Sequence, residues 1–104
     1  MSAPAPTHEV ELTLYVSGAS DRAARAIADA RALCDAHLAG RHVLLVVDVN
    51  EDPAAFLRSG ALAAPALVRT RPPPTRRLVG DLSDAAKVLL ALGLLDPPPA
   101  RRSA

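Results

Sequence analysis

Sulfur chemistry in this chain depends on Cys34, because the sequence contains a single cysteine. A lone cysteine cannot form an intramolecular disulfide or a Cys-x-x-Cys redox pair, and this usage favours a reducing compartment. Cys34 lies beside Leu33 in a stretch of helical periodicity, where a cysteine is typical of a hydrophobic core. We interpret it as a core thiol. A redox or thiol-binding enzyme that uses Cys34 is the competing interpretation.

Histidines and carboxylates form no catalytic or metal-binding pattern. The three histidines lack the spacing of zinc ligands: His8, His37 and His42. Three acids follow a predicted strand, where a catalytic pair could lie, but helix capping and solvation explain them better: Asp48, Glu51 and Asp52. The sequence also lacks a Gly-rich phosphate loop and a nucleophile elbow. We therefore predict no catalytic residue, no metal site and no cofactor.

Composition predicts one small domain with no nucleic-acid partner. The 104 residues leave room for one core, and half of them are hydrophobic. The net charge of +1 and the scarcity of aromatic residues, Tyr15 and Phe56 alone, argue against nucleic-acid binding. No apolar segment reaches the roughly 18 residues of a membrane span. Residues 1–8 do not resemble a signal peptide. We expect a cytoplasmic protein that contacts no membrane.

The first half of the chain predicts a strand, a helix and a second strand. Apolar residues alternate over 9–17, which indicates a strand with one buried face. Helical spacing follows over 21–39, with Ser20 placed as the N-cap and Gly40 placed to end the helix. Residues 41–49 form a nearly continuous apolar run, which is typical of a central strand covered on both faces. Such a βαβ unit makes the two strands parallel.

The second half predicts a short helix and then two strands joined by prolines. Asp52 as cap and Pro53 at the first position begin a helix that ends near Ser59. Two strand-length runs follow, over 66–69 and 77–79. Their connection contains three consecutive prolines, which cannot continue a helix and which form a stiff turn.

A last helix is predicted over residues 84–95, with Asp81 or Ser83 as its cap. Its apolar residues surround most of its circumference. So broad an apolar surface predicts that the sheet or another subunit covers much of this helix.

This order of elements, βαβ, α, ββ and α, is the thioredoxin-like α/β arrangement. The predicted domain covers residues 9–95, between a disordered leader at 1–8 and a disordered basic tail at 96–104. In thioredoxin-like proteins a cis-proline begins the third strand, and Pro65 resembles it in position. The strand–helix junction that carries their redox thiol is Ser17-Gly18-Ala19-Ser20 here, which contains no sulfur.

Arginines crowd the predicted strand pair, at positions 69, 71, 76 and 77, and no acid follows until Asp81. A solvated hairpin edge explains such charge without any function. A surface that meets an acidic partner is the alternative.

Several motifs together resemble the KaiB family of bacterial clock proteins over about residues 10–95. They are Leu14-Tyr15-Val16-x-Gly18, Val47-Asp48-Val49, Asp52-Pro53, Leu62-Ala63-x-Pro65-x-Leu67, Pro72-Pro73-Pro74 and Gly80-Asp81-Leu82-Ser83. The triple proline followed by basic residues and Gly-Asp-Leu-Ser is the most specific part of the match.

The resemblance implies a protein that is not an enzyme and that binds KaiC, a hexameric RecA-like ATPase. The family's basic partner-binding positions match Arg25, Arg69, Arg76 and Arg77, whereas Gly60 stands where the family commonly has lysine. A clock histidine kinase, whose sensor domain shares the fold, or another clock component is a further expected partner. A KaiB-like module in stress or other signalling is the alternative function, followed by a redox protein.

The resemblance also implies a metamorphic protein. KaiB proteins keep the N-terminal βαβ half and repack the C-terminal half between a thioredoxin-like monomer and an oligomer, so we expect a homo-oligomer, dimer or tetramer, in one state. Slow cis–trans exchange at X-Pro bonds suits such a change and points to Pro65, Pro72, Pro73 and Pro74. Relatives often have glycine at the position of Ala91 and aspartate at that of Gly93. Alanine is the better helix former, so Ala91 is expected to favour the thioredoxin-like state.

Overall fold

β1 (Val10–Val16) lies inside a four-stranded sheet with the strand order β2-β1-β3-β4. The computed structural model describes residues 9–95. The other elements follow in chain order: α1 (Asp21–His37), β2 (His42–Asp48), α2 (Pro53–Ser59), β3 (Ala66–Arg71), β4 (Arg76–Val79) and α3 (Ala85–Ala91). Every element predicted from the sequence is present, in the predicted order.

The βαβ unit has the predicted parallel pairing. The register of β1 with β2 runs from Val10 opposite His42 to Val16 opposite Asp48. β1 pairs with β3 in antiparallel fashion, as does β3 with β4. β1 therefore has a neighbour on both sides, and it anchors the N-terminal and C-terminal halves to each other.

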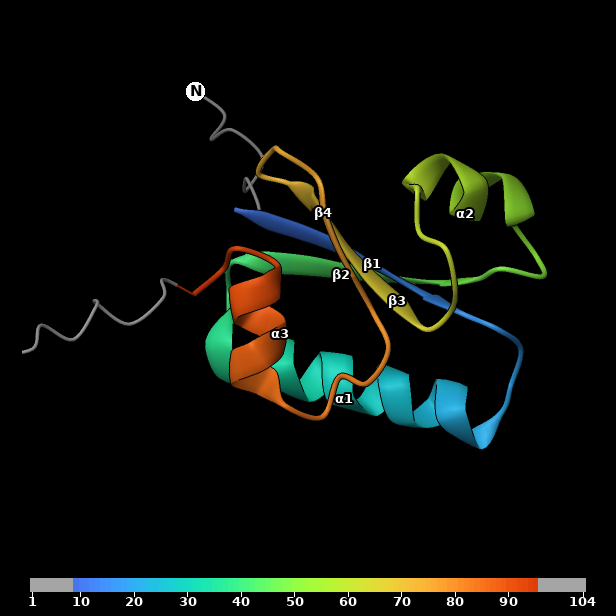
Figure 1. The fold of residues 1–104 in the computed structure, drawn as a ribbon. Coiled ribbons are helices and arrows are strands. Elements are labelled where there is room, and N and C mark those ends of the chain that lie inside the picture. The colour runs from blue at the N-terminus through green and yellow to red at the C-terminus, as the bar shows by residue number, and fades with distance from the viewer. Residues whose placement is uncertain (1–8, 96–104) are drawn as a thin grey trace, which may run out of the picture.

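α1 and α3 cover one face of the sheet and α2 covers the other (Figure 1). The larger hydrophobic core lies on the α1 and α3 side and contains Leu12, Leu14, Leu67 and Val88. These side chains come from both halves of the chain, so this core joins the halves through apolar burial.

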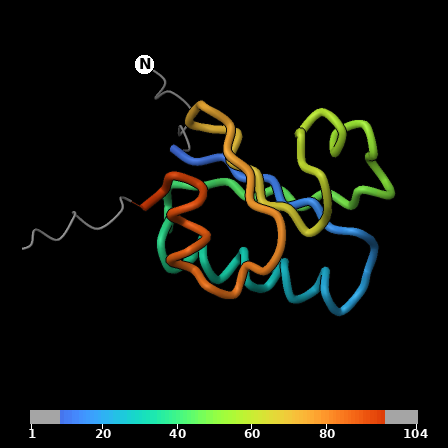
Figure 2. Tube along the Cα trace, viewed as in Figure 1, coloured from blue at the N-terminus to red at the C-terminus, as the bar shows by residue number. Residues whose placement is uncertain are grey.

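A smaller core lies between the sheet and α2. It contains Tyr15, Ala66 and Val68, with Phe56 of α2 packed against them. The rings of Tyr15 and Phe56 meet edge to face with centroids 5.7 Å apart, a favourable geometry for aromatic rings. The chain then returns from α2 to β3 through residues 60–65 (Figure 2). Because α2 has only seven residues, it covers this face in part.

Two helices begin at the predicted caps. The Ser20 hydroxyl accepts a hydrogen bond from the Ala23 amide at 3.0 Å. The Asp52 carboxylate accepts one from the Ala55 amide, also at 3.0 Å. Each cap satisfies an amide that has no partner within its own helix. No helix among residues 9–95 has both the length and the hydropathy to cross a membrane.

The cap of α3 corrects a prediction. Asp84, rather than Asp81 or Ser83, accepts a hydrogen bond from the Lys87 amide at 3.2 Å. The Asp81 carboxylate instead accepts hydrogen bonds from the hydroxyl and the amide of Ser83, in a turn before the helix. These bonds are the main reason why the pKa of Asp81 is lowered. A carboxylate that accepts hydrogen bonds within its own turn is not free to cap a helix. This competition explains why Asp81 does not cap α3.

α3 ends four residues earlier than the predicted Leu95. The Gly93 amide donates to the Leu90 carbonyl at 3.1 Å, and the Leu94 amide donates to the Leu89 carbonyl at 2.8 Å. Gly93 has a φ of 68°, in the left-handed region. This combination is a Schellman motif, in which a left-handed glycine terminates a helix. The broad apolar pattern therefore continues past the point at which the backbone leaves the helix.

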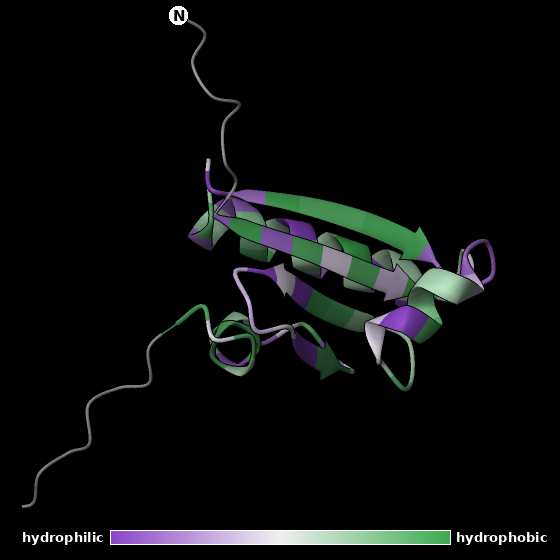
Figure 3. Ribbon diagram, turned by 90° about the horizontal axis from the view of Figure 1, so that it is seen from above, coloured by the Kyte–Doolittle hydropathy of each residue, from purple (hydrophilic) through white to green (hydrophobic). Residues whose placement is uncertain are grey.

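β2 is an edge strand, so the prediction of a central strand covered on both faces is wrong. It pairs with β1 alone, and the side chains of Leu45 and Val46 are 57% and 37% exposed. Figure 3 shows β2 as a nearly continuous hydrophobic strand along one edge of the sheet. The physical reason is topological. The crossover from α1 places β2 on the outer side of β1, and β3 takes the inner side.

Candidate functional site

The β1–α1 junction, where a redox thiol is expected in this arrangement, has a structural role. The Ser20 hydroxyl caps α1, and the Gly18 amide donates to the Asp48 carboxylate at 3.2 Å. A hollow of about 220 Å³ lies beside the junction and reaches Ala64 and Pro65. The junction offers serine hydroxyls to this hollow and no thiol, so it lacks the nucleophile of thiol–disulfide exchange.

Cys34 is buried inside the larger core, as predicted. Burial, with a smaller contribution from the negative charge of Asp35, raises the pKa of the Cys34 thiol to about 11. The reactive form of cysteine is the thiolate, so this thiol is both inaccessible and protonated near neutral pH.

The acids that follow β2 act as backbone acceptors. Asp48 accepts hydrogen bonds from the amides of Gly18 and Asn50, and Asp52 caps α2. The interpretation of these carboxylates as turn and cap residues is confirmed for Asp48 and Asp52. Within residues 9–95, no group of three histidine, cysteine or acidic side chains is placed to hold a metal ion.

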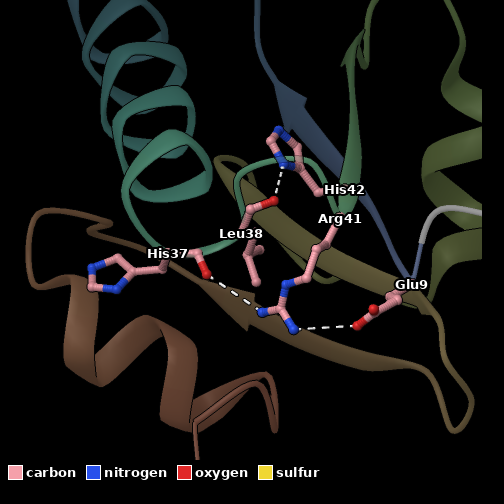
Figure 4. Close-up of polar contacts among 5 residues, drawn as sticks. All are labelled: Glu9, His37, Leu38, Arg41 and His42. Atoms are coloured by element: carbon pink, nitrogen blue, oxygen red, sulfur yellow. Dashed lines mark hydrogen bonds and ion pairs between the residues drawn. The ribbon is translucent and has the colours of Figure 1, made fainter.

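The two described histidines lie on either side of the α1–β2 turn (Figure 4). His42 bonds through Nδ1 to the Leu38 carbonyl at 2.7 Å. Arg41 donates to the His37 carbonyl and pairs with Glu9 at 3.2 Å. These contacts fasten the end of α1 to the start of the sheet. His8 lies outside the described residues.

Arg25, the first of the predicted partner-binding residues, is exposed on α1. With Arg22 it lines a hollow of about 230 Å³ that also touches Pro65 and Asp81. The charge of Arg25 makes a minor contribution to the lowered pKa of Asp81. Arg25 therefore lies near the start of β3, away from the hairpin tip at residues 72–75.

The sheet divides the other three predicted arginines between its two faces. Arg69 lies opposite Arg76, whereas Arg77 lies opposite Val68. Successive residues of a strand point to opposite faces. Arg69 and Arg76 consequently approach Gly93 at the end of α3, and Arg77 lies at the end of α2. Arg76 and Arg77 are adjacent in sequence but do not form one continuous patch.

Exposure also separates these arginines. Arg69 is buried, at 5% exposed, whereas Arg25, Arg76 and Arg77 are exposed. Arg77 and Arg58 line a shallow hollow of about 250 Å³ on the α2 face. A protein that approaches the folded chain can contact Arg25, Arg76 and Arg77 directly.

The residues predicted to influence a change of fold lie at the two ends of β3 and at the end of α3. Pro65 is buried immediately before β3, and its bond to Ala64 is cis, like that of the proline at this position in thioredoxin-like proteins. The three prolines of the β3–β4 turn include cis bonds at Pro72 and Pro74. Ala91 is the exposed last residue of α3, and Gly93 terminates that helix.

The exposed edge of β2 is a functional candidate that the sequence interpretation missed. A long apolar run is expected both for a covered strand and for an edge strand that docks a partner, so the sequence pattern does not distinguish them. Strand order distinguishes them here, because only one side of β2 is paired.

Comparisons with known proteins connect these features to a family. The KaiB domain model matches residues 13–94. Circadian clock oscillator protein KaiB of Prochlorococcus marinus strain NATL2A is 40% identical over 84 residues, which are 81% of this chain and 78% of that protein. The KaiB protein of Gloeothece citriformis strain PCC 7424 is 38% identical over 84 residues, which are 81% of this chain and 79% of that protein.

Solved structures confirm the thioredoxin-like fold. The N-terminal domain of Synechococcus elongatus SasA superposes with a TM-score of 0.71 at 22% identity, over 94% of this chain and 96% of that chain. The germline-specific thioredoxin Deadhead of Drosophila melanogaster superposes with a TM-score of 0.66 at 14% identity, over 86% of this chain and 83% of that chain. At these identities the likeness concerns the fold.

Proposed function

This chain belongs to the KaiB family of circadian clock proteins, and on that premise we propose that it is a non-enzymatic timing protein that binds a KaiC-type hexameric ATPase and changes its phosphorylation or output. A cytoplasmic location is part of this proposal. The chemistry of the chain supports a binding role, because its one thiol is buried and the β1–α1 junction carries serine in place of cysteine.

The open edge of β2 is the observation that carries the proposal of a protein-interaction module. β2 is paired on one side only, and Leu45 on it is 57% exposed. An unpaired strand edge can accept the main chain of another protein, and the neighbouring apolar side chains add buried area. Such an edge favours association with a protein partner over small-molecule chemistry.

The arginines support an acidic partner. Arg25, Arg76 and Arg77 are exposed, and none of them forms an ion pair among residues 9–95. Exposed positive charge speeds encounter with an acidic surface and selects between partners more than it sets affinity, even where the cations lie on different parts of the surface. We assign Arg25, Arg76 and Arg77 to direct contact with the ATPase, and the buried Arg69 to holding the end of α3 against the β3–β4 hairpin.

We also propose that this protein forms a homo-oligomer, either a dimer or a tetramer, and that its C-terminal half can adopt a second packing. Leu57 on α2 and Leu62 after it are 76% and 93% exposed. A second copy that covered these leucines would remove their side chains from water, so we take them as candidates for the contact between copies. We propose that the prolines at 65, 72, 73 and 74, together with Ala91 and Gly93, set the balance between the two packings.

A KaiB-like interaction module in stress or other signalling, with a histidine kinase or another regulator as partner, is the second candidate. The open β2 edge is equally suited to it, since a strand edge does not by itself specify the partner. A thiol-dependent enzyme is a third and weaker candidate, because its only nucleophile is Cys34.

The decisive experiment is capture of partners from the native host on the tagged full chain, followed by mass spectrometry. Recovery of a RecA-like hexameric ATPase supports the clock assignment. Recovery of a histidine kinase or another regulator without such an ATPase, across nucleotide conditions and times of day, favours the second candidate. A variant with Arg25, Arg76 and Arg77 changed to glutamate should lose the ATPase, and Arg31→Glu on α1 is the matched control. Arg69 is left intact because its replacement disturbs the core.

A further inference from the structure

Arg69 is a buried cation that lacks a complete set of hydrogen-bond partners. Its side chain donates through Nη2 to the Pro74 carbonyl at 2.7 Å and through Nη1 to the Gly93 carbonyl at 3.4 Å. Its Nε is buried and has no partner. Buried charged groups are normally paired with a counter-ion, and a buried donor without a partner is costly.

A second guanidinium meets the first beside Gly93. A Cβ built on Gly93 would lie 3.0 Å from Nη1 of Arg69 and 3.2 Å from Nε of Arg76. Both guanidinium groups therefore approach the same side of Gly93, where any other residue would carry its Cβ. Among residues 9–95, ion pairs join Arg41 to Glu9 and Arg71 to Glu11, and neither Arg69 nor Arg76 has a carboxylate partner.

The local electrostatics show the same excess of positive charge. Burial first, and then the charge of Arg76, lower the pKa of Arg69. The environment therefore disfavours two adjacent cations, and one negative group between them would remove the conflict.

We propose that Arg69 and Arg76 form, over Gly93, a binding site for one oxyanion, either a phosphate or a carboxylate. A guanidinium presents several N–H donors in a planar fork, which matches the oxygens of both groups. Gly93 suits the site because a Cβ at that position would press against both guanidinium groups and disturb their arrangement. The bound anion contacts the β3–β4 hairpin and the end of α3 together, so its binding stabilises the docking of α3.

The test is a titration of the full-length ¹⁵N-labelled protein by NMR, at constant ionic strength maintained with sodium chloride. Inorganic phosphate is added in one series and acetate in the other, and the arginine Nε–H and Gly93 amide signals are followed. We expect saturable shifts confined to Arg69, Arg76 and Gly93. Saturation by phosphate alone assigns the site to phosphate groups, and comparable saturation by acetate assigns it to carboxylates. Linear shifts in both series, or none, overturn the proposal.

Variants distinguish oxyanion binding at this site from the general attraction of anions to a positively charged surface. Arg76→Gln should weaken oxyanion binding by about tenfold or more, because one charge-assisted contact is lost. Arg76 is exposed, so this variant is expected to fold. Arg69→Met tests the second arginine of the site, but it changes a buried side chain and therefore carries a greater risk of destabilising the fold. Arg31→Gln on α1 is the matched control and should bind as the parent does. Equal responses from Arg76→Gln and Arg31→Gln also overturn the proposal. KaiC takes no part in this test, so its outcome is independent of the proposed function.

Discussion

The guanidinium of Arg77 lies against the space in which position 60 would carry a side chain. A Cβ on Gly60 would be 2.8 Å from Nε of Arg77 and 2.9 Å from Cζ. Gly60 has a φ of 78° at the end of α2, and Nε of Arg77 donates to the Ser59 carbonyl next to it. The missing side chain at position 60 thus lets β4 fasten the end of α2 to the sheet.

Gly60→Ala should destabilise the fold by roughly 1–3 kcal/mol, because a left-handed φ disfavours alanine and the new Cβ meets Arg77. The measurement is the free energy of unfolding in urea for the parent, Gly60→Ala, Arg77→Ala and the double variant, which together form a double-mutant cycle. In the Arg77→Ala background we expect only the conformational cost of about 1 kcal/mol. A cycle with no coupling between the two positions would show that Arg77 moves away freely and does not fasten α2.

Ala91→Gly should shift this chain away from the thioredoxin-like state. Glycine lowers helix stability by about 0.5–1 kcal/mol relative to alanine, which changes a two-state ratio only several-fold. We expect the parent to be a mixture in dilute solution and an oligomer when concentrated, since association acts by mass action. NMR at low concentration, with light scattering across a dilution series, measures both populations. One species, insensitive to dilution and to Ala91→Gly, contradicts a switch governed by this segment.

The Cys34 thiol should make stability fall at alkaline pH. The folded thiol has a pKa of about 11, above the ordinary value near 9. Between these values the unfolded chain ionises and the folded chain does not, so the free energy of unfolding decreases as pH rises. Two pKa units correspond to roughly 2–3 kcal/mol. Unfolding curves at about pH 8 and pH 10.5 test this, with Cys34→Ala as the reference. Parallel pH profiles for parent and variant would argue against it.

Thiol chemistry should be absent from the folded protein. Cys34 is buried and protonated, so we expect no insulin reduction, no glutathione exchange, and slow alkylation unless the chain is unfolded. Turnover that disappears in Cys34→Ser would instead support the redox interpretation.

Leu45→Lys on the open edge of β2 should abolish binding of the partner protein while the fold is retained. Leu45 is 57% exposed, so its replacement changes little inside the domain, but a lysine on an edge strand opposes pairing with another chain. Circular dichroism checks the fold and a pull-down checks binding. Leu90→Lys on α3 is the matched control, because it removes a leucine that is 44% exposed and that the proposal does not assign to any contact. Equal loss in both variants would assign the effect to general hydrophobicity.

Local patterns in the sequence determined the elements and most of their ends. Alternation over β1, the caps at Ser20 and Asp52, and the proline-rich turn before β4 each depend on residues close in the chain. Local rules fail where two of them compete, as at Asp81, which stabilises its own turn while Asp84 caps α3. The family followed from the sequence too, because its motif has a fixed spacing of prolines, basic residues and Gly-Asp-Leu-Ser.

The tertiary structure alone decided what each surface presents. The same apolar run in β2 suits a covered strand or an edge, and the strand order made it an edge. The antiparallel register placed Arg76 opposite Arg69, and the end of α3 covered Arg69 but left Arg76 exposed. Exposure depends on which segments, distant in sequence, pack over a residue. That information lies in long-range contacts, which residue spacing within one segment does not contain.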